Sequence, residues 1–283
     1  MLTGSLRYIL RKTNLAFPTS LDIILNIICL VVGVPIVYFL SRALRLRSTL
    51  ITIRNPKKEA ALAVLIIVAV FAGVSVWRVL TDTVFTPNFG KYQPIVNVRG
   101  IDVVWMMFLY VIVLPPLIVA MKKTGQGFGS IGIDGKDIGR MLALGFILGA
   151  IMFAVRGGLG VSVSGGGFTS FSSSLIYGFI FFTIVGFGEE IVWRGYVQTR
   201  LIAYGGTFKG LVVTSLLFAV LWHFPSSYYK HSGVIIEAFA NTLVIFPISL
   251  LLGYIMLRSH NIIPPAIFHL FLDWSALFWQ IPV

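Results

Sequence analysis

The sequence contains a single cysteine, Cys29, and few charged side chains. One thiol cannot form an intrachain disulfide or a site of several thiolates, so disulfide-built scaffolds and cysteine-rich zinc modules are excluded. Only 11% of the 283 residues are charged, which is less than half the ordinary share of a soluble domain, whereas 57% are hydrophobic. Because the apolar excess lies in several separate blocks, it predicts an integral, multi-pass membrane protein and excludes a disordered or secreted chain.

The formal net charge of +12 does not indicate a nucleic-acid partner here. The Lys and Arg residues lie at the edges of the apolar blocks, where they set orientation and meet anionic lipid. The aromatic residues lie within the apolar runs and do not alternate with basic residues, as they do in stacking platforms for nucleic acid. We therefore expect membrane lipids as partners and no nucleic acid.

Eight apolar blocks approach the roughly 20 residues that a helix needs to cross a bilayer core. They predict an all-α fold, a polytopic bundle of about eight transmembrane helices in a single integral membrane domain over residues 1–283. Three blocks are short enough to be buried or re-entrant segments instead. The predicted spans are residues 23–40, 60–77, 103–121, 141–155, 175–188, 211–222, 238–257 and 262–283. Two connections are long, 81–102 and 157–174, and the Gly/Ser-rich composition of the second is typical of a flexible loop.

The charge distribution leaves two membrane orientations open. Fourteen Lys and Arg residues lie on the side of the connection that follows Glu190, and eight lie on the other side. The positive-inside rule then places that connection in the cytoplasm and both termini outside. The basic N-terminal segment, with Arg7, Arg11 and Lys12, favours the opposite orientation.

Ionisable residues occur inside the apolar blocks only in the second half of the chain. Such residues are expensive in a membrane and are candidate functional groups by default. This asymmetry predicts N-terminal accessory helices in residues 1–140 and a catalytic core in residues 141–283. The candidate site residues are Glu189, Glu190, Arg194, His223, His269 and Asp273.

Glu189 and Glu190 follow directly on a Val-Gly-Phe-Gly run. Glu190 and Arg194 are four residues apart, on one helical face, so the guanidinium can neutralise this carboxylate in apolar surroundings. Glu189 has no such partner nearby in the sequence. In the alternative interpretation, both glutamates simply end a span at the membrane interface.

His223 is predicted to lie at the depth of Glu189. If the chain turns at Gly205 and Gly206, Glu189 lies 17 residues before Gly206 and His223 lies 17 residues after it, so two antiparallel helices would bring them level. A structural histidine is the alternative. His269 and Asp273 share one helical face, either as site residues or as a polar pair that joins helices.

The remaining polar motifs narrow the chemistry. His231 and His260 lie in connections and receive no role. The sequence has no Gly-x-Ser-x-Gly, no His-Glu-x-x-His and no Gly-rich phosphate loop, so serine, classical zincin and nucleotide-driven enzymes have no support. Carboxylates and imidazoles from three spans supply a base, an orienting imidazole and donors to an oxyanion, which is the equipment of acyl hydrolysis.

These three motifs together resemble a known family. Glu189-Glu190-x-x-x-Arg194, then His223 at the end of an apolar segment, then His269-x-x-x-Asp273 is similar to the signature of the CAAX prenyl protease 2 and bacteriocin-processing (CPBP) intramembrane endopeptidases. The resemblance covers about a third of the chain. It implies an eight-helix fold with a cavity open to the cytosol, and glutamic-type proteolysis without a required metal or other cofactor, in a family formerly classed as metalloendopeptidases. In a prokaryote the protein would lie in the plasma membrane.

The resemblance also implies a role for each motif residue. Glu189 would be the general base and His223 would hold the same water. Glu190 with Arg194 would order the site and the substrate, and His269 would donate to the oxyanion. The expected partner is a peptide or a membrane-protein substrate, with or without a lipid group.

Two positions depart from the family pattern. Many members have Phe four residues before the second-motif histidine, whereas here Phe218 lies five before His223 and Ala219 holds the usual place. Prenyl proteases end the third motif in Asn, whereas this chain has Asp273, which as a carboxylate cannot donate a hydrogen bond. Asp273 would then fix the tautomer of His269 or be protonated.

Two further functions stay open at the level of sequence. The side chains of Glu189, His223, His269 and Asp273 are also suitable zinc ligands, so a zinc-dependent membrane peptidase is one alternative. A non-catalytic membrane scaffold or immunity protein that uses the cavity for binding is the other.

Overall fold

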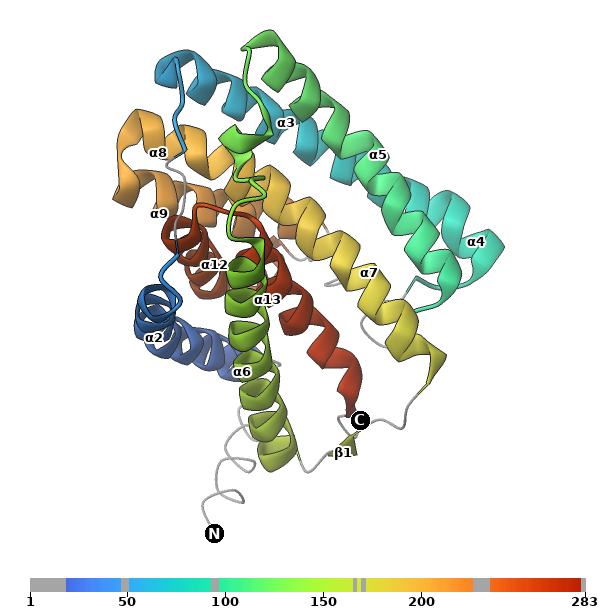
Figure 1. Cartoon of the computed structure of the whole chain (residues 1–283). Helices are drawn as coiled ribbons and strands as arrows, with labels where there is room; N and C mark the ends of the chain where they lie inside the picture. The colour runs from blue at the N-terminus through green and yellow to red at the C-terminus, as the bar shows by residue number, and fades with distance from the viewer. Residues whose placement is uncertain are drawn as a thin grey trace.

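The computed structural model describes residues 19–46, 51–92, 97–164, 167–168, 172–225 and 235–280. The described chain is a helical bundle (Figure 1), as predicted, with one pair of two-residue strands, β1 (Gly167–Phe168) and β2 (Trp279–Gln280), paired antiparallel. His231, the basic N-terminal segment, and residues 281–283 of the last predicted span lie outside the described residues.

The first half of the chain forms long helices that begin and end at recognisable signals. Proline at the first helical position starts α3, and a hydrogen-bonded capping box of Arg99 and Asp102 starts α5. The elements are α2 (Thr19–Ala43), α3 (Pro56–Leu80), the π-helical η1 (Thr81–Phe85), α4 (Thr86–Phe89), α5 (Gly100–Lys123), the 3₁₀ turn η2 (Phe128–Ile131) and α6 (Ile138–Ser164).

The second half carries the motifs. Its elements are α7 (Ser173–Glu190), the π-helical η3 (Ile191–Gln198), α8 (Thr199–Gly205), α9 (Thr207–Leu217), the π-helical η4 (Phe218–Trp222), α11 (Ile235–Leu243), α12 (Phe246–Ser259), α13 (Ile263–Trp274) and the 3₁₀ turn η5 (Ser275–Phe278). The chain reverses between α8 and α9 at Gly206, whose φ of 84° suits glycine. The predicted turn at this point is therefore confirmed.

Several predicted boundaries were wrong. The predicted connection at 81–102 begins as helix up to Phe89, and the predicted loop at 157–174 begins as helix up to Ser164. The predicted span 238–257 is interrupted between α11 and α12, where Pro247 lies in the first turn of α12 and cannot continue an incoming helix. The glycine and polar residues indicated a loop from composition alone. In the structure, the neighbouring helices favour a helix that continues through these residues.

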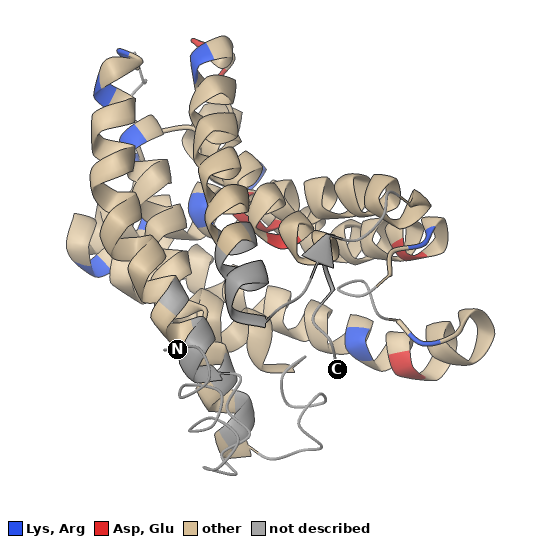
Figure 2. Ribbon diagram, turned by 90° about the horizontal axis from the view of Figure 1, so that it is seen from below, with Lys and Arg blue, Asp and Glu red and all other residues tan. Residues whose placement is uncertain are grey.

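Six described helices are long and apolar enough to cross a membrane, and two more apolar helices are shorter. The six are Asn26–Ala43, Pro56–Phe89, Gly100–Lys123, Ile138–Val155, Ser173–Gly205 and Thr207–Pro225, and the shorter two are Phe246–Ser259 and Ile263–Phe278. Large apolar side chains are exposed along the outer helices, for example Val31, Val68 and Val111. Figure 2 shows helices that carry few charged residues along their length. The protein is an integral, multi-pass membrane protein, as the composition predicted.

Helix α13 lies between α6 and α7 near the centre of the bundle (Figure 1). One buried apolar cluster joins α3, α5, α7, η3 and η4, and a second joins α2, α6 and α12. Helix α13 contributes to both, with Leu270 in the first and Phe268 and Leu272 in the second. His269 therefore lies on the helix that is shared by the two cores.

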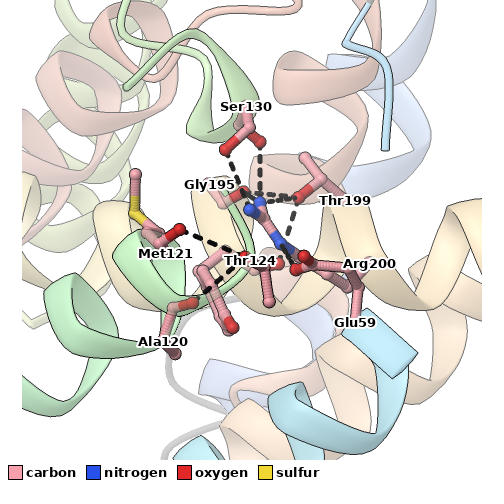
Figure 3. A network of polar contacts seen from close by, with 9 residues as sticks. Glu59, Ala120, Met121, Thr124, Ser130, Gly195, Thr199 and Arg200 are labelled. Carbon is pink, nitrogen blue, oxygen red and sulfur yellow. Dashed lines mark hydrogen bonds and ion pairs between the residues drawn. The ribbon is translucent and has the colours of Figure 1, made fainter. Parts of the chain in front are cut away.

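A buried polar network holds α3 against α8 at one end of the bundle (Figure 3). The Arg200 guanidinium lies 3.3 Å from the Glu59 carboxylate, and both side chains are buried. Arg200 also donates to the Ser130 carbonyl at 2.7 Å, the Ser130 hydroxyl at 2.8 Å and the Thr199 hydroxyl at 2.9 Å. A guanidinium with this many acceptors is well compensated for its burial, so the network fastens the N-terminal helices to the motif-bearing half.

We expect Glu59 and Arg200 to behave as a coupled pair in unfolding. Removing one partner strands the other charge in the bundle, which costs about 3–5 kcal/mol, whereas removing both is milder. Arg200→Met should therefore lower the melting temperature in detergent more than Glu59→Met combined with Arg200→Met does. Arg140→Met, at a half-exposed ion pair with Asp137, is the control and should change the melting temperature little. Additive losses from the two single variants would contradict the coupling.

Candidate active site

The two adjacent glutamates lie in the middle of a continuous helix. The helix runs from Ser173 to Gly205 through α7, η3 and α8, and Glu189 lies sixteen positions from either end. Glu189 and Glu190 are both buried, with exposed fractions of 5% and 0%. The alternative in which both glutamates end a span at the membrane interface is therefore wrong, and the predicted end of the span at residue 188 is corrected to a helix that continues beyond it.

Glu190 has two cationic or ionisable partners. Arg194 Nε lies 3.4 Å from Glu190 Oε2, which confirms the predicted i, i+4 pair, and both side chains are fully buried. His269 Nδ1 lies 3.0 Å from Glu190 Oε1, where the ring N–H donates to the carboxylate. Arg194 Nη2 also donates to the Ser249 hydroxyl of α12 at 3.1 Å. The first and third motifs thus meet at Glu190.

His269 lies among three carboxylates. Its Nε2 is 3.4 Å from Asp273 Oδ2 and 3.8 Å from Glu189 Oε2, while its Nδ1 faces Glu190. This proximity needs a close approach of α7 and α13, because a Cβ added at Gly186 would lie 2.7 Å from the Ala266 carbonyl oxygen. Gly186 in the Val-Gly-Phe-Gly run therefore admits the helix that carries the imidazole.

The Glu189 carboxylate is held by a residue outside the predicted set. The Trp222 indole N–H donates to Glu189 Oε1 at 2.7 Å. The other oxygen, Oε2, is buried and has no hydrogen-bond partner among the described residues. Glu189 therefore presents one fixed oxygen and one oxygen that is available to accept a proton.

His223 follows Trp222 directly, so the end of η4 lies beside Glu189, in agreement with the matched depth predicted from the turn. His223 Nε2 is buried without a hydrogen-bond partner among the described residues. The ring of His223 packs edge-on against Phe218, with centroids 4.9 Å apart. His223 therefore lies near the carboxylates but is not itself hydrogen-bonded to them.

The five-residue spacing of Phe218 and His223 is explained by the local helix. Residues 218–222 form a π-helix, in which i and i+5 share a face, as i and i+4 do in an α-helix. The Phe218 ring also lies 6.4 Å from the His269 ring and 4.3 Å from the Arg194 guanidinium carbon. The departure from the usual spacing thus still brings the aromatic ring to the site.

Four contacts of the site were not predicted from the sequence. They come from Trp222, Phe218, Ser249 and, in the N-terminal half, Tyr110, whose hydroxyl donates to the Val185 carbonyl of α7 at 3.2 Å. Tyr110 packs over Gly188, where an added Cβ would collide with its ring. Of these four residues, only Trp222 could have been indicated by the sequence, because a buried indole N–H beside a motif histidine needs a hydrogen-bond acceptor.

In the part of the chain that the structure describes, no three His, Cys, Asp or Glu side chains are arranged to hold a metal ion. The two nitrogens of His269 face different carboxylates, and His223 Nε2 has no hydrogen-bond partner among the described residues. The zinc alternative therefore gains no geometric support from these residues.

Comparison with known proteins identifies the motif-bearing segment. Residues 171–275 match the family model of Rce1-like type II CAAX prenyl endopeptidases. No curated protein matches the chain. No solved structure matches it either. The matched segment spans α7 to α13 and contains the six predicted site residues. The match confirms the resemblance seen in the motifs: residues 171–275 are a domain of the CAAX-protease-like membrane endopeptidase family, within an integral multi-pass membrane protein.

Proposed function

We propose that this protein is an intramembrane endopeptidase that hydrolyses a peptide bond with a water activated by Glu189 and His223. The observation that carries the proposal is the Glu189 carboxylate: Oε1 accepts from Trp222, and Oε2 has no hydrogen-bond partner among the described residues and lies 3.8 Å from His269 Nε2. A buried carboxylate beside an imidazole can accept and donate protons in general acid–base catalysis.

The chemical step follows from these positions. Glu189 Oε2 accepts a proton from a water that His223 Nε2 also contacts, and the water oxygen attacks the carbonyl carbon of the scissile bond. The negative charge that develops on the carbonyl oxygen is stabilised by the Nε2–H of His269. The C–N bond then breaks, and the proton on Glu189 passes to the leaving nitrogen, which yields a carboxylic acid and an amine.

Glu190, Arg194 and Asp273 act on this centre through His269. Glu190 accepts from Nδ1, so the imidazole keeps a proton on that side and turns Nε2 toward Glu189. Arg194 balances the charge of Glu190, and Asp273, 3.4 Å from Nε2, favours the protonated nitrogen that donates to the oxyanion. Burying this set of charges without a reaction to perform would cost several kcal/mol, which a binding scaffold does not need.

A peptide within the membrane is the substrate that fits this site. The catalytic helices are apolar on their outer faces and carry the site at mid-length, so a substrate reaches it from lipid or from a cavity between helices. The family to which the segment is similar acts on prenylated CAAX ends. A peptide that ends in a prenylated Cys, two aliphatic residues and one further residue is therefore the first substrate to test, with its unprenylated form beside it.

Glu189→Gln is expected to abolish cleavage, because the amide cannot take a proton from water, and general-base catalysis is typically worth about 10²- to 10⁴-fold. Membranes from cells that contain the wild-type chain or the variant are compared by proteomics of new protein termini, and the purified proteins by cleavage of the two peptides in liposomes. Unchanged melting in detergent shows that the variant is folded. Identical sets of termini in both membranes would favour the scaffold function.

Asp273→Asn is expected to keep cleavage within about tenfold of wild type, because the amide oxygen can still accept from His269 Nε2 while the amide N–H₂ adds a donor. Asp273→Leu removes the acceptor that favours a protonated His269 Nε2, so the oxyanion loses its donor and the rate should fall by about 100-fold or more. The peptide assay measures both rates. Equal losses in the two variants would mean that the negative charge of Asp273 itself is required.

We further propose that hydrolysis needs no metal, so cleavage of the peptides should persist after treatment with EDTA or 1,10-phenanthroline and dialysis. The carboxylate and imidazole groups supply both base and oxyanion donor without a Lewis acid. A known zinc peptidase treated in parallel is the control. Loss of cleavage that is restored by added zinc would establish the zinc-dependent alternative.

A further inference from the structure

We infer that Trp222 is a positioning residue for the catalytic carboxylate: its indole N–H fixes Glu189 Oε1 and thereby directs Oε2 to the water. The inference rests on the proposed function of Glu189 and adds a residue that lies outside the three charged motifs. It is based on one contact, the 2.7 Å hydrogen bond from Trp222 Nε1 to Glu189 Oε1.

The chemistry of indole suits this role. The indole N–H is a donor only, so it holds a carboxylate oxygen but cannot compete for the proton that the base removes from water. A hydrogen bond to an ionised oxygen is about twice as strong as one between neutral groups. Once Oε1 accepts the indole N–H, Oε2 is the oxygen that carries no hydrogen bond among the described residues, and it lies on the side of His269.

The fold places Trp222 rigidly enough to act in this way. Trp222 is the last residue of η4 and is 7% exposed, and its ring packs edge-on against Trp193 with centroids 6.3 Å apart. The next residue, His223, packs on Phe218. Consecutive residues of a helix point to different sides, so one short segment delivers the donor to Glu189 and the second imidazole to the water.

Trp193 provides a matched control for packing. It is fully buried and lies next to Trp222, but its Nε1 has no hydrogen-bond partner among the described residues. A Trp→Phe change at either position removes the same volume and the same N–H group from the same neighbourhood. Only the change at 222 removes a hydrogen bond to the carboxylate.

The kinetic test uses wild type, Trp222→Phe and Trp193→Phe in liposomes with the prenylated CAAX peptide. We expect Trp222→Phe to lower kcat by about 10- to 100-fold, the range for a lost hydrogen bond to a charged group, with little change in KM. Trp193→Phe should stay within about threefold of wild type. Equal kcat values for the two variants, or an increase in KM with kcat unchanged, would overturn the positioning role.

A spectroscopic test is independent of turnover. In protein labelled with ¹⁵N at the indole nitrogens and held in detergent micelles, the Trp222 and Trp193 signals are assigned by their loss in the two Phe variants. Glu189→Gln should move the Trp222 indole proton upfield, because its acceptor loses its charge, and leave the Trp193 signal in place. An unmoved Trp222 signal would show that the indole does not bind the carboxylate.

The two tests separate the inference from the function on which it rests. Cleavage by wild type and none by Glu189→Gln, with equal rates for the two Trp variants, rejects only the role of Trp222. A wild-type protein that cleaves neither peptide and leaves membrane termini unchanged rejects the proposed function, and the positioning role with it.

Discussion

The hydrogen bond between Glu190 and His269 is the contact on which the rest of the site depends. A carboxylate that is fully buried in an apolar bundle must be paired, and here its two oxygens face Arg194 from its own helix and His269 from α13. The bond holds α7 and α13 together at the point where Gly186 lets their backbones approach. Because α13 is also shared by both apolar cores, this single polar contact fixes the imidazole relative to the whole bundle.

The N-terminal helices carry none of the motifs, yet they brace the helix that does. Tyr110 of α5 packs over Gly188 and donates to Val185, directly before the glutamates. Beyond the site, Glu59 of α3 is paired with Arg200, which also reaches back to the carbonyl of Gly195 at 3.4 Å. The glutamate-bearing helix is thus held from both sides, which suits a reaction that needs side chains kept in fixed positions.

The membrane class, the helical bundle and the grouping of the site residues could be predicted because each follows from local sequence. Glu190 with Arg194 is an i, i+4 relation, and the turn at Gly206 sets the level of Glu189 against that of the segment that ends at His223. The partners of these groups could not be predicted. Ser249 and Trp222 are reached through tertiary packing, and nothing in the chain near either residue indicates which carboxylate or guanidinium it will meet.

The predictions of two helix boundaries were wrong for a related reason. The sequence favoured the end of a span where charge begins, at Glu189, and a loop where glycine and serine accumulate, after Gly157. The structure continues as helix in both places, to Gly205 and to Ser164. A charged side chain disfavours a transmembrane helix where that side chain would face lipid. Here both glutamates face protein partners, so the helix can continue past them.

The π segments η3 and η4 explain why motif spacing and α-helical geometry disagree at the site. One begins directly after Glu190 and the other ends directly before His223, so both motif helices widen where they meet. Within the described residues, the first also contains buried polar atoms without hydrogen-bond partners, among them Trp193 Nε1 and Arg194 Nη1. A widened helix with unpaired polar groups is less stable than a regular one, and such departures are expected at functional sites. The extra residue between Phe218 and His223 is therefore accommodated by the helix type, so the aromatic ring still reaches the imidazole.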